Sequence, residues 1–329
     1  MDSVFVTGAT GFVGSYLCRK FLQEGFAVSA LRRETSNLSA LEDIHHRILW
    51  VNGDVRDPTS MAEAIASATY VIHSAAIISF TPETRELMYQ VNVEGTRSVV
   101  SLCKQHTPKK LCLISSSAAL GKPSTGTTID ESIDTSKSFK NTHYATTKYL
   151  AEQEVKQALE EGLPGVIVNP PVVLGAGGWE QSSGRLIDYV WRGKSLYPSG
   201  IINLVDVRDL CEVVYQLTVG SQHKEQFLVS AHSIFYKELF ERVAQHLQVP
   251  PPHRKLSRWI AEVAWRVEAL RSKLTGSKPF ITQENAQSTS SRYTYDSTKL
   301  LTSLNYQFRS LEETLSWVCE AFLNKEKVP

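Results

Sequence analysis

Short apolar runs alternate with segments of helical spacing through the first half of the chain. The runs have the length and β-branched content of buried strands. They fall at 4–7, 27–31, 48–51, 70–73, 111–114 and 166–168. Helical patterns lie between them, near 12–24, 59–67, 84–106 and 143–161. Strands joined by helices predict right-handed crossovers and a doubly wound α/β fold with a parallel sheet, in which ligands bind beyond the carboxyl ends of the strands.

The pattern loosens after Pro170 and Pro171. Helical stretches are predicted near 183–193, 206–219, 235–247 and 256–274, with little strand between them. We therefore expect a smaller, mostly helical C-terminal lobe that binds the substrate. The predicted division is 1–170 and 171–329, with segments near 202–230 returning to the first part.

The stretch 256–274 has an apolar stripe at helical spacing, with Lys and Arg residues around it. We expect it to pack over the substrate cleft or against another subunit. The alternative is a helix that lies in a membrane interface and delivers a lipophilic substrate. Trp179, Tyr189, Trp191 and Tyr197 either line an apolar pocket or pack in the core of the lobe.

Composition narrows the class of protein. The 329 residues include 35 Lys and Arg against 34 Asp and Glu, a formal net charge of +1. This balance gives no electrostatic reason to expect nucleic acid or an anionic membrane as a partner. The five scattered cysteines form no C-x-x-C pair, which indicates free thiols and a cytoplasmic protein without a metal site.

A glycine-rich turn follows the first predicted strand in TGATGFVG, with Gly8, Gly11 and Gly14 spaced G-x-x-G-x-x-G. Gly8 permits a tight turn, Gly11 lets the backbone approach a pyrophosphate, and Gly14 lets helix and strand pack closely. The N-terminus of the following helix offers N–H groups and a positive dipole to phosphates. The turn predicts a dinucleotide cofactor, and its contacts are assigned to the three glycines and to Thr10, Phe12 and Val13.

The second strand ends in Arg32 and Arg33, where an NAD-preferring site usually carries an acid. Two guanidinium groups suit the 2′-phosphate of NADP(H), although the neighbouring Glu34 leaves NAD(H) open. After the third strand, Asp54, followed by Val55, is placed to accept a hydrogen bond from the adenine amino group. After the fourth strand, Ala75 and Ala76 are small enough for the backbone to pass close to the cofactor.

Tyr144 and Lys148 form a Y-x-x-x-K pair, and their spacing puts both side chains on one face of a helix. A cation beside a phenol is expected to lower the pKa of the phenol from about 10 toward neutrality. Tyr144 is then able to exchange a proton with an alcohol or a ketone. Three serines, 115–117, follow the fifth strand, and a hydroxyl there can bond a substrate oxygen as it gains charge.

Together these segments resemble the extended short-chain dehydrogenase/reductase superfamily, also called the NAD-dependent epimerase/dehydratase superfamily, and within it the dihydroflavonol 4-reductase-like branch. The resemblance covers nearly the whole chain. The segments that carry it are TGATGFVG, LRRE, GDVRD, HSAA, NVEGT, SSSAALG, YATTK, NPPVVLG, VDVRD and YDSTKL. It implies an NAD(P)-binding Rossmann fold and an oxidoreductase that acts on CH–OH or carbonyl groups.

The resemblance also implies residue roles. Ser116, Tyr144 and Lys148 become the catalytic triad, with Ser117 as the rival serine. Pro171, Val172 and Val173 are expected to line the nicotinamide through backbone groups. Asn92 is expected to support the site from a helix beneath it, and Arg32 to hold the 2′-phosphate.

The implied reaction is the reversible, NADPH-dependent reduction of a ketone or aldehyde on a mostly apolar small molecule. A nucleotide-sugar epimerase or dehydratase with tightly bound NAD is the first alternative. It is weakened by Ala119-Leu120-Gly121, because those enzymes usually have V-Y-G there. A non-enzymatic dinucleotide sensor is the second, and Tyr144 and Lys148 argue against it. The resemblance also allows a homodimer.

Overall fold

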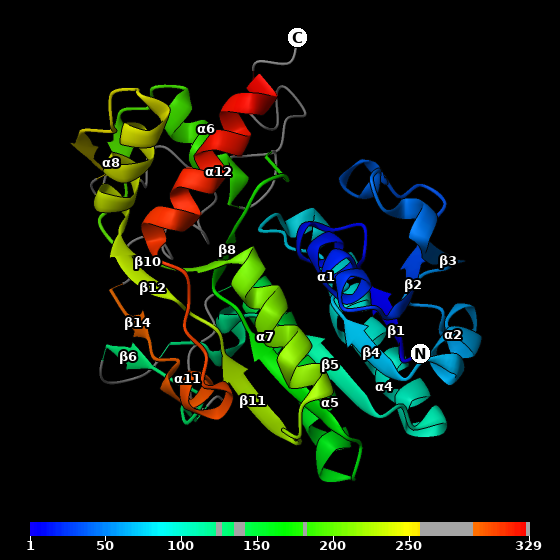
Figure 1. The fold of residues 1–329 in the computed structure, drawn as a ribbon. Helices are drawn as coiled ribbons and strands as arrows, with labels where there is room; N and C mark the ends of the chain where they lie inside the picture. Colours follow the sequence, from blue (N-terminus) through cyan, green and yellow to red (C-terminus); the bar gives the residue numbers. More distant parts are fainter. Residues whose placement is uncertain (123–126, 135–141, 180–182, 257–291, 327–329) are drawn as a thin grey trace.

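The computed structural model describes residues 1–122, 127–134, 142–179, 183–256 and 292–326. Its main sheet has seven parallel strands in the order β11-β7-β5-β4-β1-β2-β3 (Figure 1). The strands are β1 (Ser3–Thr7), β2 (Ala27–Arg32), β3 (Ile48–Asn52), β4 (Tyr70–His73), β5 (Lys110–Ile114), β7 (Gly165–Asn169) and β11 (Glu225–Leu228). The doubly wound α/β prediction is confirmed, and the strand order reverses between β1 and β4.

Helices cover both faces of this sheet. Successive residues of β1 point to opposite faces, so Val4 and Val6 join one hydrophobic cluster and Phe5 joins another. The first cluster is covered by α1 (Phe12–Gln23) and α7 (Val207–Val219). The second is covered by α2 (Ala62–Ser67), α4 (Gly95–His106) and α5 (His143–Glu160). Strands apolar on both sides are what a parallel sheet requires.

The helix predicted at 84–106 is not uniform. Pro82–Thr84 form a 3-10 turn, followed by α3 (Arg85–Tyr89), a π-helical turn at Gln90–Glu94, and α4. A π-turn accommodates one extra residue within a helix and commonly occurs at functional sites. Apolar spacing does not reveal it, because the helix on each side keeps its ordinary period. The other 3-10 turns of the described residues are Ser39–Leu41, His45–Arg47, Pro58–Ser60 and Ser117–Leu120.

The described part of the chain after Pro171 is mostly helical, as predicted, but it also contains short strands that the sequence did not predict. A three-stranded sheet orders β12 (His232–Phe235), β10 (Ile201–Asp206) and β8 (Val172–Leu174), with β10 parallel to β8 and antiparallel to β12. Two parallel pairs join β6 (Thr128–Ile129) to β14 (Thr294–Tyr295) and β9 (Leu196–Tyr197) to β13 (Arg254–Lys255). These strands are two to six residues long, mostly too short for a periodicity of two to be recognised.

The helices of the C-terminal lobe surround a third hydrophobic cluster. They are α6 (Gly184–Trp191), α8 (Tyr236–Leu247) and α12 (Leu311–Glu326), while α11 (Thr298–Leu304) packs beside β11. Trp179 and Trp191 both contact the ring of Phe322, with ring centroids 5.2 and 6.1 Å apart, and Tyr189 stacks on Phe240. The predicted aromatic residues therefore pack in the core of the lobe.

The VDVRD segment joins this lobe to the main sheet. Asp206 accepts a hydrogen bond from the backbone N–H of Arg208 at the start of α7, and another from Thr314 of α12, at 2.7 and 2.9 Å. Asp209 is fully buried. It accepts a hydrogen bond from Tyr306 at 2.8 Å and forms an ion pair with Arg309. The division into 1–170 and 171–329 stays a prediction. β11 is a strand of the main sheet, and α7 packs on one face of that sheet. Residues 257–274 of the predicted amphipathic helix lie outside the described residues.

The described part of the chain contains no helix long and apolar enough to span a membrane. All five cysteines are free, as predicted, and all five are buried.

Candidate functional site

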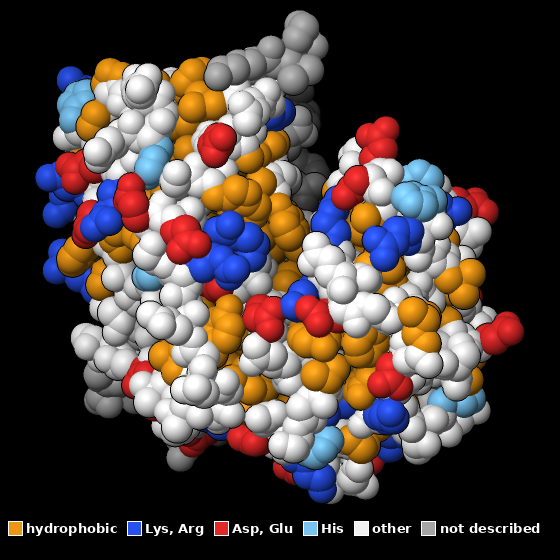
Figure 2. All heavy atoms as spheres, viewed as in Figure 1, with side chains coloured by type: hydrophobic (Ala, Val, Ile, Leu, Met, Phe, Trp, Pro, Cys, Tyr) orange, Lys and Arg blue, Asp and Glu red, His pale blue; other side chains and the backbone are white. Residues whose placement is uncertain are grey.

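The predicted site residues converge on the carboxyl edge of the main sheet. The glycine turn (residues 8–14) follows β1, Arg32 ends β2, Asp54 follows β3, Ala75 follows β4 and Ser116 follows β5. Figure 2 shows a hollow between the part that carries α1 and β2 and the lobe that carries α12, with hydrophobic side chains along it. In doubly wound folds this edge, at the reversal of strand order, is where ligands bind.

The glycine turn is built by close backbone contacts. Gly8 has a φ of +71°, and a Cβ there would lie 2.6 Å from the backbone nitrogen of Ala75. A Cβ on Gly14 would lie 2.1 Å from the carbonyl oxygen of Gly8. Gly11 caps the N-terminus of α1, and no side chain of the described residues bonds the N–H groups there. This bare helix N-terminus at the strand-order reversal fits a dinucleotide pyrophosphate.

The other residues of the turn divide between backbone and side-chain roles. The Phe12 ring lies 5.6 Å from the ring of Tyr16, and a Cβ on Gly175 would lie 2.9 Å from it. Its side chain is thus directed toward the loop after β8, so its predicted cofactor contact falls to the backbone. Thr10 and Val13 are half-buried beside it, one in the turn and one in the first turn of α1.

The predicted adenine end carries three arginines, at positions 32, 33 and 56, and two acids, Glu34 and Asp54. Arg32 donates to Asn52 Oδ1 at 3.0 Å, and its guanidinium lies 5.4 Å from the centre of the Trp50 ring. The pKa of the Asp54 carboxyl is lowered, chiefly by hydrogen bonds from Arg56 at 2.9 Å and less by the charge of Arg33. Among the described residues, neither Arg32 nor Arg33 forms an ion pair with a carboxylate.

Val55 does not reach the adenine end through its side chain. It is buried in the core, and a Cβ on Gly95 of α4 would lie 2.8 Å from its Cγ2. Its predicted cofactor contact is therefore restricted to backbone atoms. Ala76 is exposed and Ala75 half-buried, which leaves the backbone after β4 accessible.

A buried histidine holds the loop after β4 in place. Thr96 donates to the carbonyl of Asn92 at 2.6 Å, so its oxygen must accept from His73 Nε2 at 2.9 Å. His73 Nδ1 is then an acceptor for Thr7 at 2.7 Å, and Thr7 accepts in turn from the N–H of Ala75 at 3.3 Å. Burial lowers the pKa of His73 to about 3, with help from the charge of Lys148. The ring is neutral at pH 7 and acts as a fixed polar link.

Ser116, Tyr144 and Lys148 are brought together from two elements. Thr142 caps α5 by accepting from the N–H of Ala145 at 3.0 Å, which fixes the start of the helix just before Tyr144. The Ser116 hydroxyl faces Tyr144, and Lys148 Nζ donates to the carbonyl of Ile114 at the end of β5, at 3.0 Å. Ser116 and Tyr144 are half-buried, whereas Lys148 is 3 % exposed.

The expected lowering of the Tyr144 pKa by Lys148 is not found. The pKa of Tyr144 is raised by burial, against a smaller opposing effect of the hydrogen bond from Ser116. Desolvation disfavours phenolate, and Lys148 directs its ammonium group at a backbone carbonyl. At neutral pH the phenol is consequently a proton donor. Burial lowers the pKa of Lys148 to about 8, and the charge of Glu152 opposes this.

The two rival serines have different partners. Ser116 faces Tyr144, whereas the Ser117 hydroxyl is buried and bonds Tyr295 of β14. The backbone N–H of Ser117 donates to the carbonyl of Pro170 at 2.9 Å. The predicted nicotinamide residues Pro171, Val172 and Val173 follow that carbonyl directly, and all three are half-buried.

Asn92, in the π-helical turn, clamps the loop after β4 to α5. Its Oδ1 accepts from the N–H of Ile77 at 2.7 Å, and its Nδ2 donates to the Ile77 carbonyl and to Thr147, both at 3.0 Å. The loop held in this way continues to Phe80, whose ring meets the Tyr144 ring edge-on at 6.4 Å. Sequence reasoning missed Phe80, which carries no motif.

Three further polar residues near the site were also missed. Glu152 is fully buried one turn after Lys148, and it is bonded to Asn169 of β7 and Gln226 of β11. The four-residue spacing after Lys148 was a usable signal for Glu152. The partners on β7 and β11 are distant in sequence and gave none.

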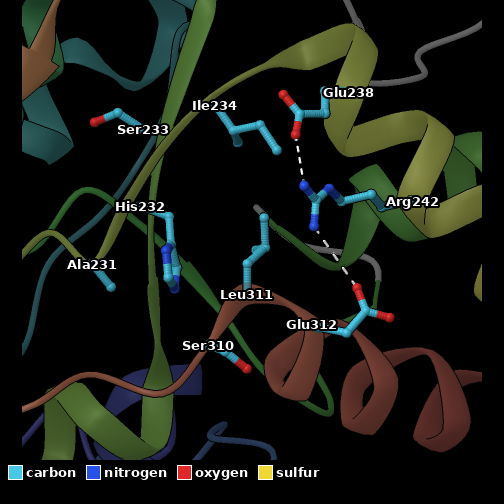
Figure 3. Close-up of a pocket in the computed structure, with 9 residues that line it drawn as sticks. All are labelled: Ala231, His232, Ser233, Ile234, Glu238, Arg242, Ser310, Leu311 and Glu312. Carbon is cyan, nitrogen blue, oxygen red and sulfur yellow. Dashed lines mark hydrogen bonds and ion pairs between the residues drawn. The ribbon is translucent and has the colours of Figure 1, made fainter.

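A pocket of about 440 Å³ lies apart from these residues, in the C-terminal lobe (Figure 3). It is formed by β12, α8 and the start of α12, and Arg242 lies between Glu238 and Glu312, at 2.7 and 3.9 Å. Its guanidinium charge is already balanced by two carboxylates. None of the residues predicted for the site lines it.

Comparison with known proteins gives consistent results. A family model described as "NAD dependent epimerase/dehydratase family" matches residues 4–227. A Synechocystis sp. protein that carries a dihydroflavonol 4-reductase name is 28% identical over 98% of this chain and 95% of its own. A 3-beta-hydroxysteroid dehydrogenase of Mycolicibacterium neoaurum is 31% identical over 54% of this chain and 49% of its own. A crystal structure titled gox2253 superposes with a TM-score of 0.85 at 29% identity and covers 100% of both chains.

Proposed function

Since the chain belongs to the NAD-dependent epimerase/dehydratase family and is an NAD(P)-dependent oxidoreductase, we propose that it reduces a ketone or aldehyde on a mostly apolar small molecule. We propose NADPH as the reductant, with alcohol oxidation as the reverse reaction. The observation that carries this proposal is the meeting of Ser116, Tyr144 and Lys148 at the carboxyl end of β5.

In the proposed reaction each residue has one task. Reduced nicotinamide, when bound, supplies the hydride for the carbonyl carbon. Tyr144 is a neutral phenol at pH 7 and donates its proton to the carbonyl oxygen. The Ser116 hydroxyl fixes that oxygen by a hydrogen bond that strengthens as negative charge develops. Lys148, mostly an ammonium ion at pH 7, is held at the end of β5 by the Ile114 carbonyl and bonds the nicotinamide ribose.

The preference for NADPH is proposed from the end of β2. Arg32 and Arg33 form no ion pair with an acid in the part of the chain that the structure describes, so their charge is available to a 2′-phosphate. A cation–π contact with the Trp50 ring, at 5.4 Å from its centre, helps to hold the Arg32 guanidinium in place. A site made for the 2′-hydroxyl of NAD would place a carboxylate here.

An apolar substrate is proposed from the wall beside Tyr144. The loop held by Asn92 presents Phe80 edge-on to Tyr144, and Ile78 in the same loop is 57% exposed. Exposed apolar side chains next to a reacting group favour an apolar substrate. Relatives with dihydroflavonol reductase and hydroxysteroid dehydrogenase names support the same choice.

The test is NADPH oxidation by the purified protein across a panel of apolar and polar carbonyl compounds, followed at 340 nm with the products identified. We expect oxidation with apolar ketones or aldehydes and the matching alcohol as product. Copurified NAD that resists dialysis, or interconversion of a nucleotide sugar without net oxidation of NADPH, would instead show an epimerase or dehydratase. A cytoplasmic location and a homodimer stay predictions.

A further inference from the structure

Four long side chains follow one another along a single face of α5. Tyr144, Lys148, Glu152 and Lys156 are each four residues apart, so they lie one above the next. Glu152 is the most deeply placed of them, with 0% of its surface exposed. A buried carboxylate is tolerated when it is paired and fully hydrogen-bonded.

The hydrogen-bond partners of Glu152 come from two other elements. Asn169 Nδ2, at the end of β7, donates to one carboxyl oxygen at 2.5 Å, and Gln226 Nε2, on β11, donates to the other at 3.1 Å. Asn169 Nδ2 also donates to the Ser116 carbonyl at 2.9 Å, and a carbonyl only accepts, so the orientation of this amide is fixed. Gln226 gives its second hydrogen to Asn169 Oδ1 at 2.7 Å. Both carboxyl oxygens therefore accept N–H bonds, which favour the ionised form and oppose the larger effect of burial, which raises the pKa of the Glu152 carboxyl.

Among the described residues, the charged groups that act on Glu152 are two lysines of α5. They are Lys148 and Lys156, and Lys156 Nζ lies 3.7 Å from the carboxylate. From β4, His73 faces Lys148 and is neutral, while β7, β11 and the loop after β5 contribute the uncharged Asn169, Gln226 and Ser115. The Glu152 carboxylate is thus the negative charge that faces Lys148 among the described residues. It opposes the effect of burial on the Lys148 pKa.

We propose that Glu152 is a positioning residue for the site: its carboxylate keeps Lys148 in the ammonium form and, through Asn169, fixes the backbone of Ser116. This rests on the proposed function for the use that the site makes of Lys148. The network itself is independent of the substrate. It connects the catalytic face of α5 to the outer strands β7 and β11, so these strands contribute to the charge of the site as well as to its support.

The sign of the effect follows from the charges. Replacing Glu152 by Gln removes the negative charge, so the pKa of Lys148 falls further and the ammonium ion is lost at a lower pH. The alkaline limb of kcat/KM for carbonyl reduction is expected to move about one pH unit lower in Glu152→Gln. Glu152→Asp keeps the charge and is expected to keep the limb near the wild-type position.

The matched control is Glu154→Gln. Glu154 lies on the same helix and pairs with Arg97 at the surface, so this variant makes the same chemical change away from the site. Its pH profile should coincide with that of the wild type. Thermal unfolding of each variant shows whether it is folded. If Glu152→Gln does not fold, Glu152→Asp provides the test. An alkaline limb of kcat/KM at the wild-type pH supports the proposal, and an alkaline limb a full pH unit lower contradicts it.

A second readout needs no substrate. The dissociation constant of NADPH, measured by its fluorescence from pH 6 to 10, should rise with pH as Lys148 loses its proton, and it should rise earlier in Glu152→Gln. Folded Glu152→Gln with wild-type pH dependence in binding would overturn the proposal. If none of the carbonyl compounds in the panel makes the wild-type protein oxidise NADPH, only the proposed function is overturned, because the binding curves still test Glu152.

Discussion

At the glycine turn, backbone lies against backbone: Gly8 meets the nitrogen of Ala75, and Gly14 meets the carbonyl of Gly8. The face of α5 that carries residues 144, 148, 152 and 156 differs, because long side chains there place charged groups in the protein interior. The turn depends on the absence of side chains at its three glycines. The α5 face depends on hydrogen bonds from β5, β7 and β11.

This difference separates binding from chemistry. A steric cradle places the cofactor and has little influence on proton transfer, whereas a charged face sets proton affinities and contributes less to holding the dinucleotide. Changes in the turn should therefore reduce cofactor affinity. Changes on α5 should reduce turnover at saturating cofactor.

The largest effect on binding is expected for Gly8→Ala. The new methyl would lie 2.6 Å from the Ala75 nitrogen at a φ of +71°, so the turn must shift. We expect NADPH affinity to fall by at least about 100-fold, measured by fluorescence titration, since the N–H groups of the turn no longer meet the phosphates.

Gly25→Ala is the matched control. Gly25 also has a positive φ, +81°, but a Cβ there would have no heavy atom within 4 Å. It shares the backbone strain without the close contact, and its NADPH affinity should stay near that of the wild type. Equal losses in the two variants would show that strain, and not the cradle, decides binding.

A smaller effect is expected for Arg32→Ala, which leaves the turn intact. Removing one charged partner of the 2′-phosphate should weaken NADPH binding roughly 10- to 100-fold and leave NADH binding nearly unchanged. Titrations with both cofactors measure this, with the exposed Arg47 replaced by Ala as a control of equal charge. NADH bound more tightly than NADPH by the wild type would contradict the role given to Arg32.

Local patterns were sufficient for the N-terminal sheet. β4 was predicted with its observed bounds, and β1 and β2 to within one residue, because buried parallel strands are continuous apolar runs between helices. The strands β8 and β12 were not predicted, since they have three and four residues and are stabilised by β10, far from β12 in sequence. The π-turn around Asn92 was likewise hidden within one helical pattern.

The functional site likewise combines features that the sequence predicted with features that it did not. Motif spacing placed the glycine turn, Ser116, Tyr144 and Lys148, whose contacts are local or lie at strand ends. It did not give the direction of the Tyr144 pKa, because burial depends on what covers the residue from elsewhere in the chain. Phe80 and the partners of Glu152 depend on tertiary contacts in the same sense.

The most direct measurement is turnover and NADPH binding on Tyr144→Phe, with a carbonyl substrate from the panel. The phenylalanine keeps the ring against Phe80 and removes the proton donor. We predict that kcat falls about 1,000-fold or more while the dissociation constant of NADPH changes less than about threefold. Turnover near the wild-type rate would contradict the account, because proton transfer would then not depend on Tyr144.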